Sequence, residues 1–147
     1  MPENYLHSEL TSEIIRSFYK VYNTLGYGFL EKVYQNSLLI ELERCGLNCS
    51  SSYAIDVFYK DIKVGYFVAD IVVQNLVIIE VKSVDSICEE HEAQLLNYLK
   101  ATKIEVGLIV NFGKKLQFKR KVFHRIIRPI KWQGTQILMI VMVYHDF

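Results

Sequence analysis

The chain has 147 residues, of which 51% are hydrophobic and 13% aromatic, which is enough for one globular domain with a buried core over residues 1–147. The N-terminal stretch is polar and acidic, which argues against a secretory signal, and the longest apolar run, residues 137–143, is too short for a membrane span. The three cysteines are odd in number and lack a CxxC pair, which argues against a disulfide framework, so we expect a soluble, cytoplasmic protein. The formal charge of +1 excludes a uniformly basic protein, yet eight of the 17 Lys and Arg residues fall within residues 114–131 without any acid.

Two helices are predicted in the first third of the chain. Apolar residues recur at helical spacing over residues 10–25, and Thr11 or Ser12 is available as the N-terminal cap. A second helical pattern covers about residues 30–45 and is ended by Gly46. Its core face is expected to carry Val33, Leu38 and Leu42.

The period then changes to that of strands, with one more helix among them. The helix is predicted over residues 91–102, where Leu95, Leu96 and Leu99 are apolar. Segments rich in Val, Ile, Tyr and Phe predict strands at residues 53–59, 64–73, 76–84, 106–112 and 116 to about 127, with 137–143 as a possible edge strand. The order ααβββαββ, with this possible last strand, predicts an α/β (α+β) fold with a mixed sheet and flanking helices.

Three charged residues interrupt the apolar strands. Asp70 lies within VADIVV, and Glu80 and Lys82 lie within VIIEVKSV, where an ionised group costs several kcal/mol unless it is paired or binds a metal. A three-residue hairpin loop centred on Asn75 places Asp70 directly across from Glu80. Strand alternation then puts Lys82 on the same face as both carboxylates.

Two interpretations of this arrangement are open. Opposed carboxylates repel each other, and a hard cation such as Mg²⁺ that prefers oxygen ligands would remove the repulsion, while Lys82 could orient or deprotonate an attacking water. A cross-strand ion network that only satisfies itself is the alternative, and the bare spacing of these residues favours it.

Four ordered motifs resemble a known family, and this resemblance favours the metal site. They are GFLEKVY at residues 28–34, VADIVVQNLVIIEVKSV at 68–84, HEAQLLNYLKAT at 91–102 and GLIVNFG at 107–113. Together they resemble the GxxExxY family, which is assigned to the PD-(D/E)XK nuclease superfamily, over about residues 8–125. The resemblance implies a restriction-endonuclease-like core that binds Mg²⁺ or Mn²⁺. Residue 69 is alanine where the superfamily's name has proline.

The resemblance also implies roles for the individual residues. Asp70 and Glu80 would bind the metal, the Val81 carbonyl would be an additional ligand, and Lys82 would be the lysine of the E-x-K element. Glu31 falls on the family's G-x-x-E position and would be a further ligand or an orienting acid. From the sequence alone, Glu31 could equally be a glutamate in a first helical turn that complements the helix dipole.

The predicted helix at residues 91–102 carries further candidates. Gln94 and Tyr98 are four residues apart, so they share a helix face and match the superfamily's QxxxY element. Without the resemblance they would be interpreted as a surface amide and a core aromatic. His91 lies one turn before Gln94, and a substrate phosphate is its expected partner. Cys88 and His91 have C-x2-H spacing, but half a zinc site is too little to predict zinc.

The basic segment is the candidate for holding nucleic acid. Alternation places Lys119 and Lys121 on one strand face and Arg120 on the other, and the resemblance favours Arg120 as the side chain directed towards the active site. The alternative is a solvated strand surface. Residues 126–147 match no motif, and their apolar strand could pair with another copy of the chain.

Three functions follow from these observations. The first is a Mg²⁺- or Mn²⁺-dependent phosphodiesterase acting on nucleic acid, with DNA favoured. The second is a nucleic-acid-binding or assembly module that keeps the fold without turnover, although the retained Asp70, Glu80 and Lys82 weigh against this. The third is a purely structural oligomer, which rests on the C-terminal strand alone.

Overall fold

The computed structural model describes residues 6–146, and the side chains of these residues apart from 126–130, 132 and 137–146. Within this range the chain forms three helices and six strands, in the predicted order with the additional last strand. They are α1 Ser8–Leu25, α2 Glu31–Arg44, β1 Cys49–Tyr59, β2 Ile62–Val73, β3 Val77–Lys82, α3 Glu89–Ala101, β4 Val106–Phe112, β5 Leu116–Trp132 and β6 Thr135–Asp146.

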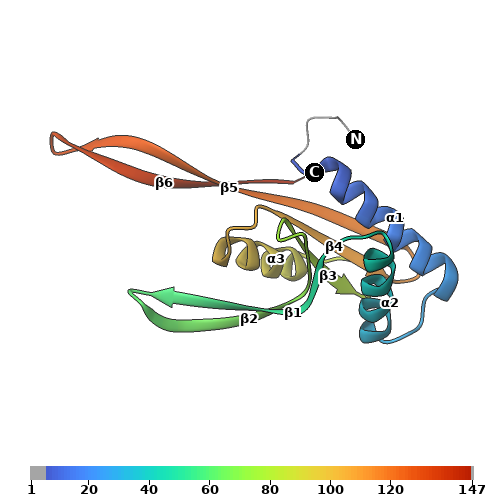
Figure 1. The fold of residues 1–147 in the computed structure, drawn as a ribbon. Coiled ribbons are helices and arrows are strands. Elements are labelled where there is room, and N and C mark those ends of the chain that lie inside the picture. The colour runs from blue at the N-terminus through green and yellow to red at the C-terminus, as the bar shows by residue number, and fades with distance from the viewer. Residues whose placement is uncertain (1–5, 147) are drawn as a thin grey trace.

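The strands form one mixed sheet in which their spatial order equals their chain order, from β1 to β6. Every neighbouring pair is antiparallel except β3 and β4, which are parallel and are joined by α3. A parallel pair needs such a crossover, because a tight hairpin can join only antiparallel strands. α1 and α2 pack on one face of the sheet and α3 on the other (Figure 1). The predicted fold class is confirmed.

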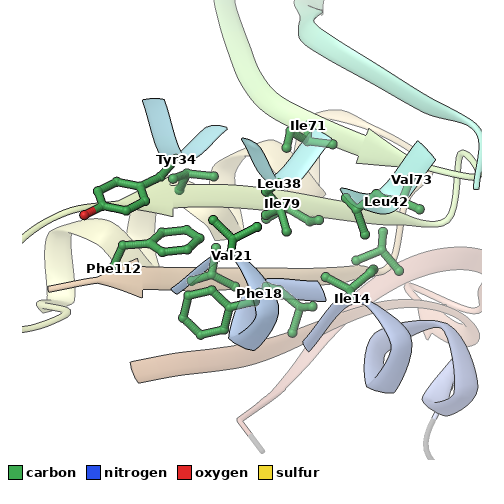
Figure 2. Packing of buried hydrophobic residues seen from close by; sticks show 14 of the residues in the cluster. Ile14, Phe18, Val21, Tyr34, Leu38, Leu42, Ile71, Val73, Ile79 and Phe112 are labelled. Carbon is green, nitrogen blue, oxygen red and sulfur yellow. The ribbon is translucent and has the colours of Figure 1, made fainter. Parts of the chain in front are cut away.

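Aromatic rings anchor the core between the sheet and the first two helices. The ring of Tyr34 stacks on Phe112 with 4.4 Å between centroids, and Phe18 meets Phe112 edge-on at 4.7 Å. All three side chains are fully buried, and aliphatic residues of both helices surround them (Figure 2). Burying an apolar side chain of this size contributes about 1.5–3 kcal/mol, so this contact holds α2 firmly over the sheet.

Two details of the predicted helices are wrong. α1 begins at Ser8 with His7 as its N-cap, and Thr11 is buried, where its hydroxyl donates to the carbonyls of His7 and Ser8 at 3.1 Å. Thr11 therefore satisfies backbone acceptors inside the helix instead of capping it. Val33 was expected in the core but is 37% exposed, because the core face of α2 is set by Tyr34, Leu38 and Leu42.

Two hairpins extend the sheet beyond the core. β1 and β2 turn at Lys60 and Asp61, and β5 and β6 pair from Lys121↔Asp146 to Trp132↔Thr135 (Figure 1). The predicted edge strand is thus confirmed, and β5 runs to Trp132, beyond the predicted end near residue 127. Among the described residues, no helix combines the length and apolar character that a bilayer-spanning segment needs.

Candidate metal centre

The turn between β2 and β3 sets the register that brings the two acids together. Gln74 and Asn75 both have positive φ values, 54° and 55°, and the strands pair as Ile71↔Ile79, Val72↔Ile78 and Val73↔Val77. This is the register that a loop centred on Asn75 predicts. The ladder stops there, so Asp70 and Glu80, which would pair next, lie at the point where β2 and β3 separate.

Side chains replace the missing backbone pairs at this point. The Asp70 N–H donates to Glu80 Oε1 at 3.1 Å, and the Val81 N–H donates to Asp70 Oδ2 at 2.8 Å. Each carboxylate therefore bonds the opposite strand and keeps its second oxygen without a hydrogen-bond partner among the described residues. A carboxylate oxygen that no protein group occupies is available to a cation, and hard cations take such oxygens as ligands.

The electrostatics of the pair also fit a cation. The pKa of Glu80 is raised to about 8, first by burial and then by the neighbouring charge of Asp70, with a smaller contribution from Glu31. Burial likewise raises the pKa of Asp70, against the opposing effects of the Val81 hydrogen bond and the charge of Lys82. Desolvation and like charge both disfavour the ionised forms, and a bound cation would reverse that preference.

The residues present fit a hard divalent ion. Two carboxylates, together with the Val81 carbonyl expected from the superfamily, form an all-oxygen donor set, which Mg²⁺ and Mn²⁺ prefer over softer ligands. Glu31 does not complete a preformed cluster, since no three Asp, Glu, His or Cys side chains in the described part of the chain converge as a metal site. Waters commonly supply the remaining ligands of Mg²⁺.

α3 brings Gln94 and Tyr98 to the same site, as their spacing predicts. The Lys82 ammonium donates to Gln94 Oε1 at 3.5 Å. Tyr98 is buried against Phe67 with 5.4 Å between ring centroids, and burial followed by the charges of Glu80 and Asp70 raises its pKa to about 12. Tyr98 is therefore a neutral phenol beside the two acids.

His91 has a structural role that the sequence analysis did not predict. Its Nδ1 accepts the Cys88 N–H at 3.2 Å, and the two residues form a capping box at the start of α3. The C-x2-H spacing therefore reflects a helix cap. A phosphate contact through the other ring nitrogen of His91 stays a prediction.

A hydrogen-bonded loop delivers Glu31 to the edge of the site. The Tyr34 hydroxyl donates to the Gly26 carbonyl at 2.6 Å and accepts the Phe29 N–H at 3.2 Å, while Ser83 Oγ donates to the Phe29 carbonyl at 3.3 Å. Glu31 is the first residue of α2, it is exposed, and its charge acts on Glu80. The tyrosine of GxxExxY is thus a buried residue that shapes the approach to the acids.

Sequence analysis missed two buried amides that support the site. Gln35, four residues after Glu31, donates through Nε2 to the Asp70 carbonyl at 3.0 Å. Asn111 in β4 holds the Val84 backbone from both sides, accepting its N–H and donating to its carbonyl, each at 2.9 Å. A signal for Asn111 was available, because an amide inside the apolar strand VGLIVNF must find a partner.

The basic segment takes a different arrangement from the predicted one. Lys119 and Lys121 lie on the α3 side and bond Glu92 at 3.2 and 2.8 Å. Arg120 lies on the opposite face, is 2% exposed and donates to the Leu6 carbonyl near the start of α1. The expectation that Arg120 points towards the acids is wrong, because alternation turns it to the face covered by α1 and α2.

The other described cations of the basic segment either donate hydrogen bonds within the protein or lie exposed near the ends of β5. Arg125 donates to the carbonyls of Leu99, Lys100 and Thr102, which lie at the C-terminal end of α3. Lys114 and Lys115 are exposed in the turn before β5, and Lys131 is exposed near its end. The side chain of Arg128 lies outside the described residues.

Comparison with known proteins agrees with the fold. A mixed sheet flanked by helices, with paired acids where two of its strands separate, defines a restriction-endonuclease-like protein. The model of the PD-(D/E)XK nuclease superfamily matches residues 8–124, so the chain belongs to that superfamily. No curated protein and no solved structure matches the chain significantly.

Proposed function

We propose that the protein is a Mg²⁺- or Mn²⁺-dependent phosphodiesterase that acts on nucleic acid, with DNA as its substrate. The observation that carries the proposal is the crossed pair of hydrogen bonds between β2 and β3, which leaves one oxygen of Asp70 and one of Glu80 available together. Gly28, Glu31 and Tyr34 fit the signature of the GxxExxY family, and we place the chain within it.

Each residue has a defined task in this proposal. A divalent cation held by Asp70, Glu80 and the Val81 carbonyl would stabilise the charge that develops on the phosphodiester and acidify the attacking water. Lys82 orients that water or the phosphate, and the Gln94 amide fixes the ammonium in place. Gln35 and the Val81 N–H keep Asp70 in the orientation that presents its second oxygen.

A nucleic-acid-binding module without turnover is the second candidate. The raised pKa of Glu80 supports it, since without a cation this carboxyl is largely protonated near neutral pH, which removes the repulsion between the two acids. Self-association through β6 stays a prediction that follows from its edge position. We also place the protein in the cytoplasm, because its three cysteines are free thiols.

A structure of crystals soaked in Mn²⁺ tests the proposal directly. We expect an anomalous peak that lies within ligand distance of Asp70 and Glu80, and cleavage of plasmid DNA that depends on Mg²⁺ or Mn²⁺ and stops with EDTA. Metal at this position without cleavage of DNA or RNA would favour the binding module. No metal at this position would leave the acids as an ion network.

A further inference from the structure

The loop between α1 and α2 is held rigidly beside the acids. Both ends are fastened by backbone and side-chain hydrogen bonds: the Gly26 carbonyl binds the Tyr34 hydroxyl, and the Phe29 backbone binds Tyr34 and Ser83. Gly28 takes a φ of 110°, a conformation that side chains disfavour. Because Ser83 directly follows Lys82 and Glu31 directly follows this loop, the loop adjoins the candidate metal site from two directions.

This rigid loop exposes large apolar side chains. Tyr27 is 58% exposed, Phe29 48% and Leu30 81%, and Val33 in the first turn of α2 adds to them. We call Tyr27, Phe29, Leu30 and Val33 the ledge. A loop fastened at Gly26 and Phe29 gains no stability from keeping these side chains in water, so a surface of this kind indicates a binding partner.

Positive charge accompanies the ledge. Lys114 places its ammonium 6.0 Å from the centre of the Tyr27 ring, and its carbonyl accepts the Tyr22 hydroxyl, which fixes the backbone of the β4–β5 turn beside the loop. Lys32 is exposed within the ledge, and its charge lowers the pKa of Asp70, which places it near the acids. Exposed rings next to ammonium groups that form no ion pair with the described residues match the bases and phosphates of a nucleic-acid strand.

We propose that the ledge binds unpaired nucleobases next to the scissile phosphate, so that the substrate is single-stranded or locally unpaired nucleic acid. The proposal rests on the proposed function, because it takes the phosphate to lie at Asp70 and Glu80. Tyr27 and Phe29 stack on the bases, while Lys32 and Lys114 contact the adjoining phosphates. A duplex keeps its base faces stacked inside, so it offers the rings nothing to stack on.

Binding measurements on Tyr27 variants test the proposal. Fluorescence anisotropy would compare a mixed-sequence single strand with a duplex of the same length, in Mg²⁺ and in a Glu80→Gln background that preserves the substrate. Because stacking contributes about 1–3 kcal/mol per base, Tyr27→Leu should weaken single-strand binding roughly 5- to 150-fold and leave duplex binding nearly unchanged. Tyr27→Phe keeps the ring and should bind like the parent protein.

Tyr59 provides a matched control. It is 64% exposed, Lys60 lies 5.4 Å from its ring centre, and it pairs with Ile62 at the far end of the β1–β2 hairpin. Eight residues of strand separate Ile62 from Asp70, which is about 26 Å at about 3.3 Å per residue. Tyr59→Leu should therefore leave single-strand binding unchanged.

Several results would overturn the proposal. They are an unchanged affinity in Tyr27→Leu, an equal loss for single strand and duplex, or an equal loss in Tyr59→Leu. Loss of a dimer in Tyr27→Leu, measured by light scattering, would assign the ledge to a second copy of the chain instead. Wild-type protein that binds no Mn²⁺ and cleaves no nucleic acid would refute the proposed function separately, since the anisotropy comparison does not depend on cleavage.

Discussion

The acids of β2 and β3 and the cations of β5 are both charges inside apolar strands, but the structure treats them differently. Three cations of β5 are paired within the protein: Lys119 and Lys121 with Glu92, and Arg125 with carbonyl groups at the end of α3. Among the described residues, the carboxylates of Asp70 and Glu80 accept only backbone N–H groups, and they do so with one oxygen each.

This difference separates charged residues that stabilise the fold from charged residues that are candidates for binding a ligand. A lysine that is 5% exposed beside a glutamate offsets its own desolvation, so nothing further is needed to explain its presence in a strand. Two neighbouring carboxylates with raised pKa values do not offset theirs, and the proposed cation would do so. The following predictions test this contrast, beginning with the largest expected effect.

Removing the charge from either acid should abolish catalysis without unfolding the protein. Asp70→Asn and Glu80→Gln keep an oxygen that can accept the same backbone N–H, but they lose a ligand charge. Because metal stabilisation of a developing charge is worth several kcal/mol, we expect cleavage to fall at least about a thousandfold. The melting temperatures of both variants in EDTA should equal or exceed that of the wild-type protein, since the substitution removes a buried charge and the repulsion between the two carboxylates. Wild-type cleavage rates in either variant would contradict the metal assignment, and unfolding would favour the ion network.

Lys82→Met should separate metal binding from turnover. The lysine acts on the water or the phosphate, so calorimetry should find a nearly unchanged affinity for Mn²⁺ while kcat falls about a hundredfold or more. Lys20→Met, which changes an exposed lysine of α1, is the control and should keep full activity. Retained turnover in Lys82→Met would exclude its proposed role.

Gln35→Met should lower kcat with little effect on KM. The change removes the donor to the Asp70 carbonyl but fills a similar volume, and loss of such a supporting bond typically costs about 10- to 100-fold. Gln35 is a positioning residue, so affinity for Mn²⁺ should weaken in parallel. Ser37→Ala on the same helix removes only a bond to the Val33 carbonyl and should change neither quantity. A lower melting temperature with normal kcat and Mn²⁺ affinity would make Gln35 merely structural.

The metal-free protein should lose stability as pH rises. The folded pKa of Glu80, about 8, is above its ordinary value of 4.5, so the folded state retains a proton that the unfolded chain releases. That contribution is fully present below about pH 4.5 and is lost as pH rises through about 8. Melting temperatures in EDTA should fall over this range, less steeply in Glu80→Gln, while Mn²⁺ affinity should increase because the cation competes with the proton. If the difference in melting temperature between the wild-type protein and Glu80→Gln does not change with pH, the pKa of Glu80 is not raised.

The smallest effects concern the basic strand. Lys121→Met removes the buried partner of Glu92, although Glu92 still pairs with Lys119, so we expect the free energy of unfolding to fall by about 1–3 kcal/mol. Lys119→Met removes a half-exposed partner and should lower it by at most about 1 kcal/mol. If Lys119 contacts a phosphate, Lys119→Met should flatten the salt dependence of nucleic-acid affinity by about one unit. Lys121→Met and Arg120→Met should not change that slope, and a changed slope in either would restore the whole segment as a binding surface.

Local sequence determined the elements and the meeting of the two acids. Hydrophobic periodicity predicted each helix and strand, because a helix or a strand buries one face with a fixed repeat. A loop centred on Asn75 was enough to predict the β2–β3 register and hence the opposition of Asp70 and Glu80. The four-residue spacing of Gln94 and Tyr98 likewise predicted a shared helix face, and both lie at the site.

Only the tertiary structure decided which partner each polar group meets. No spacing rule connects Gln35 with the Asp70 carbonyl or Glu92 with Lys121, because those contacts depend on where α2 and α3 pack on the sheet. Alternation predicted that Arg120 and Lys121 face opposite ways, but not which face α3 covers. The alternation of side chains along a strand is a local property, whereas the helices that cover each face of the sheet are decided by long-range burial. For this reason β5, the predicted nucleic-acid-binding strand, places Lys119, Lys121 and Arg125 in contacts within the protein. The loop before Glu31 forms the exposed surface instead.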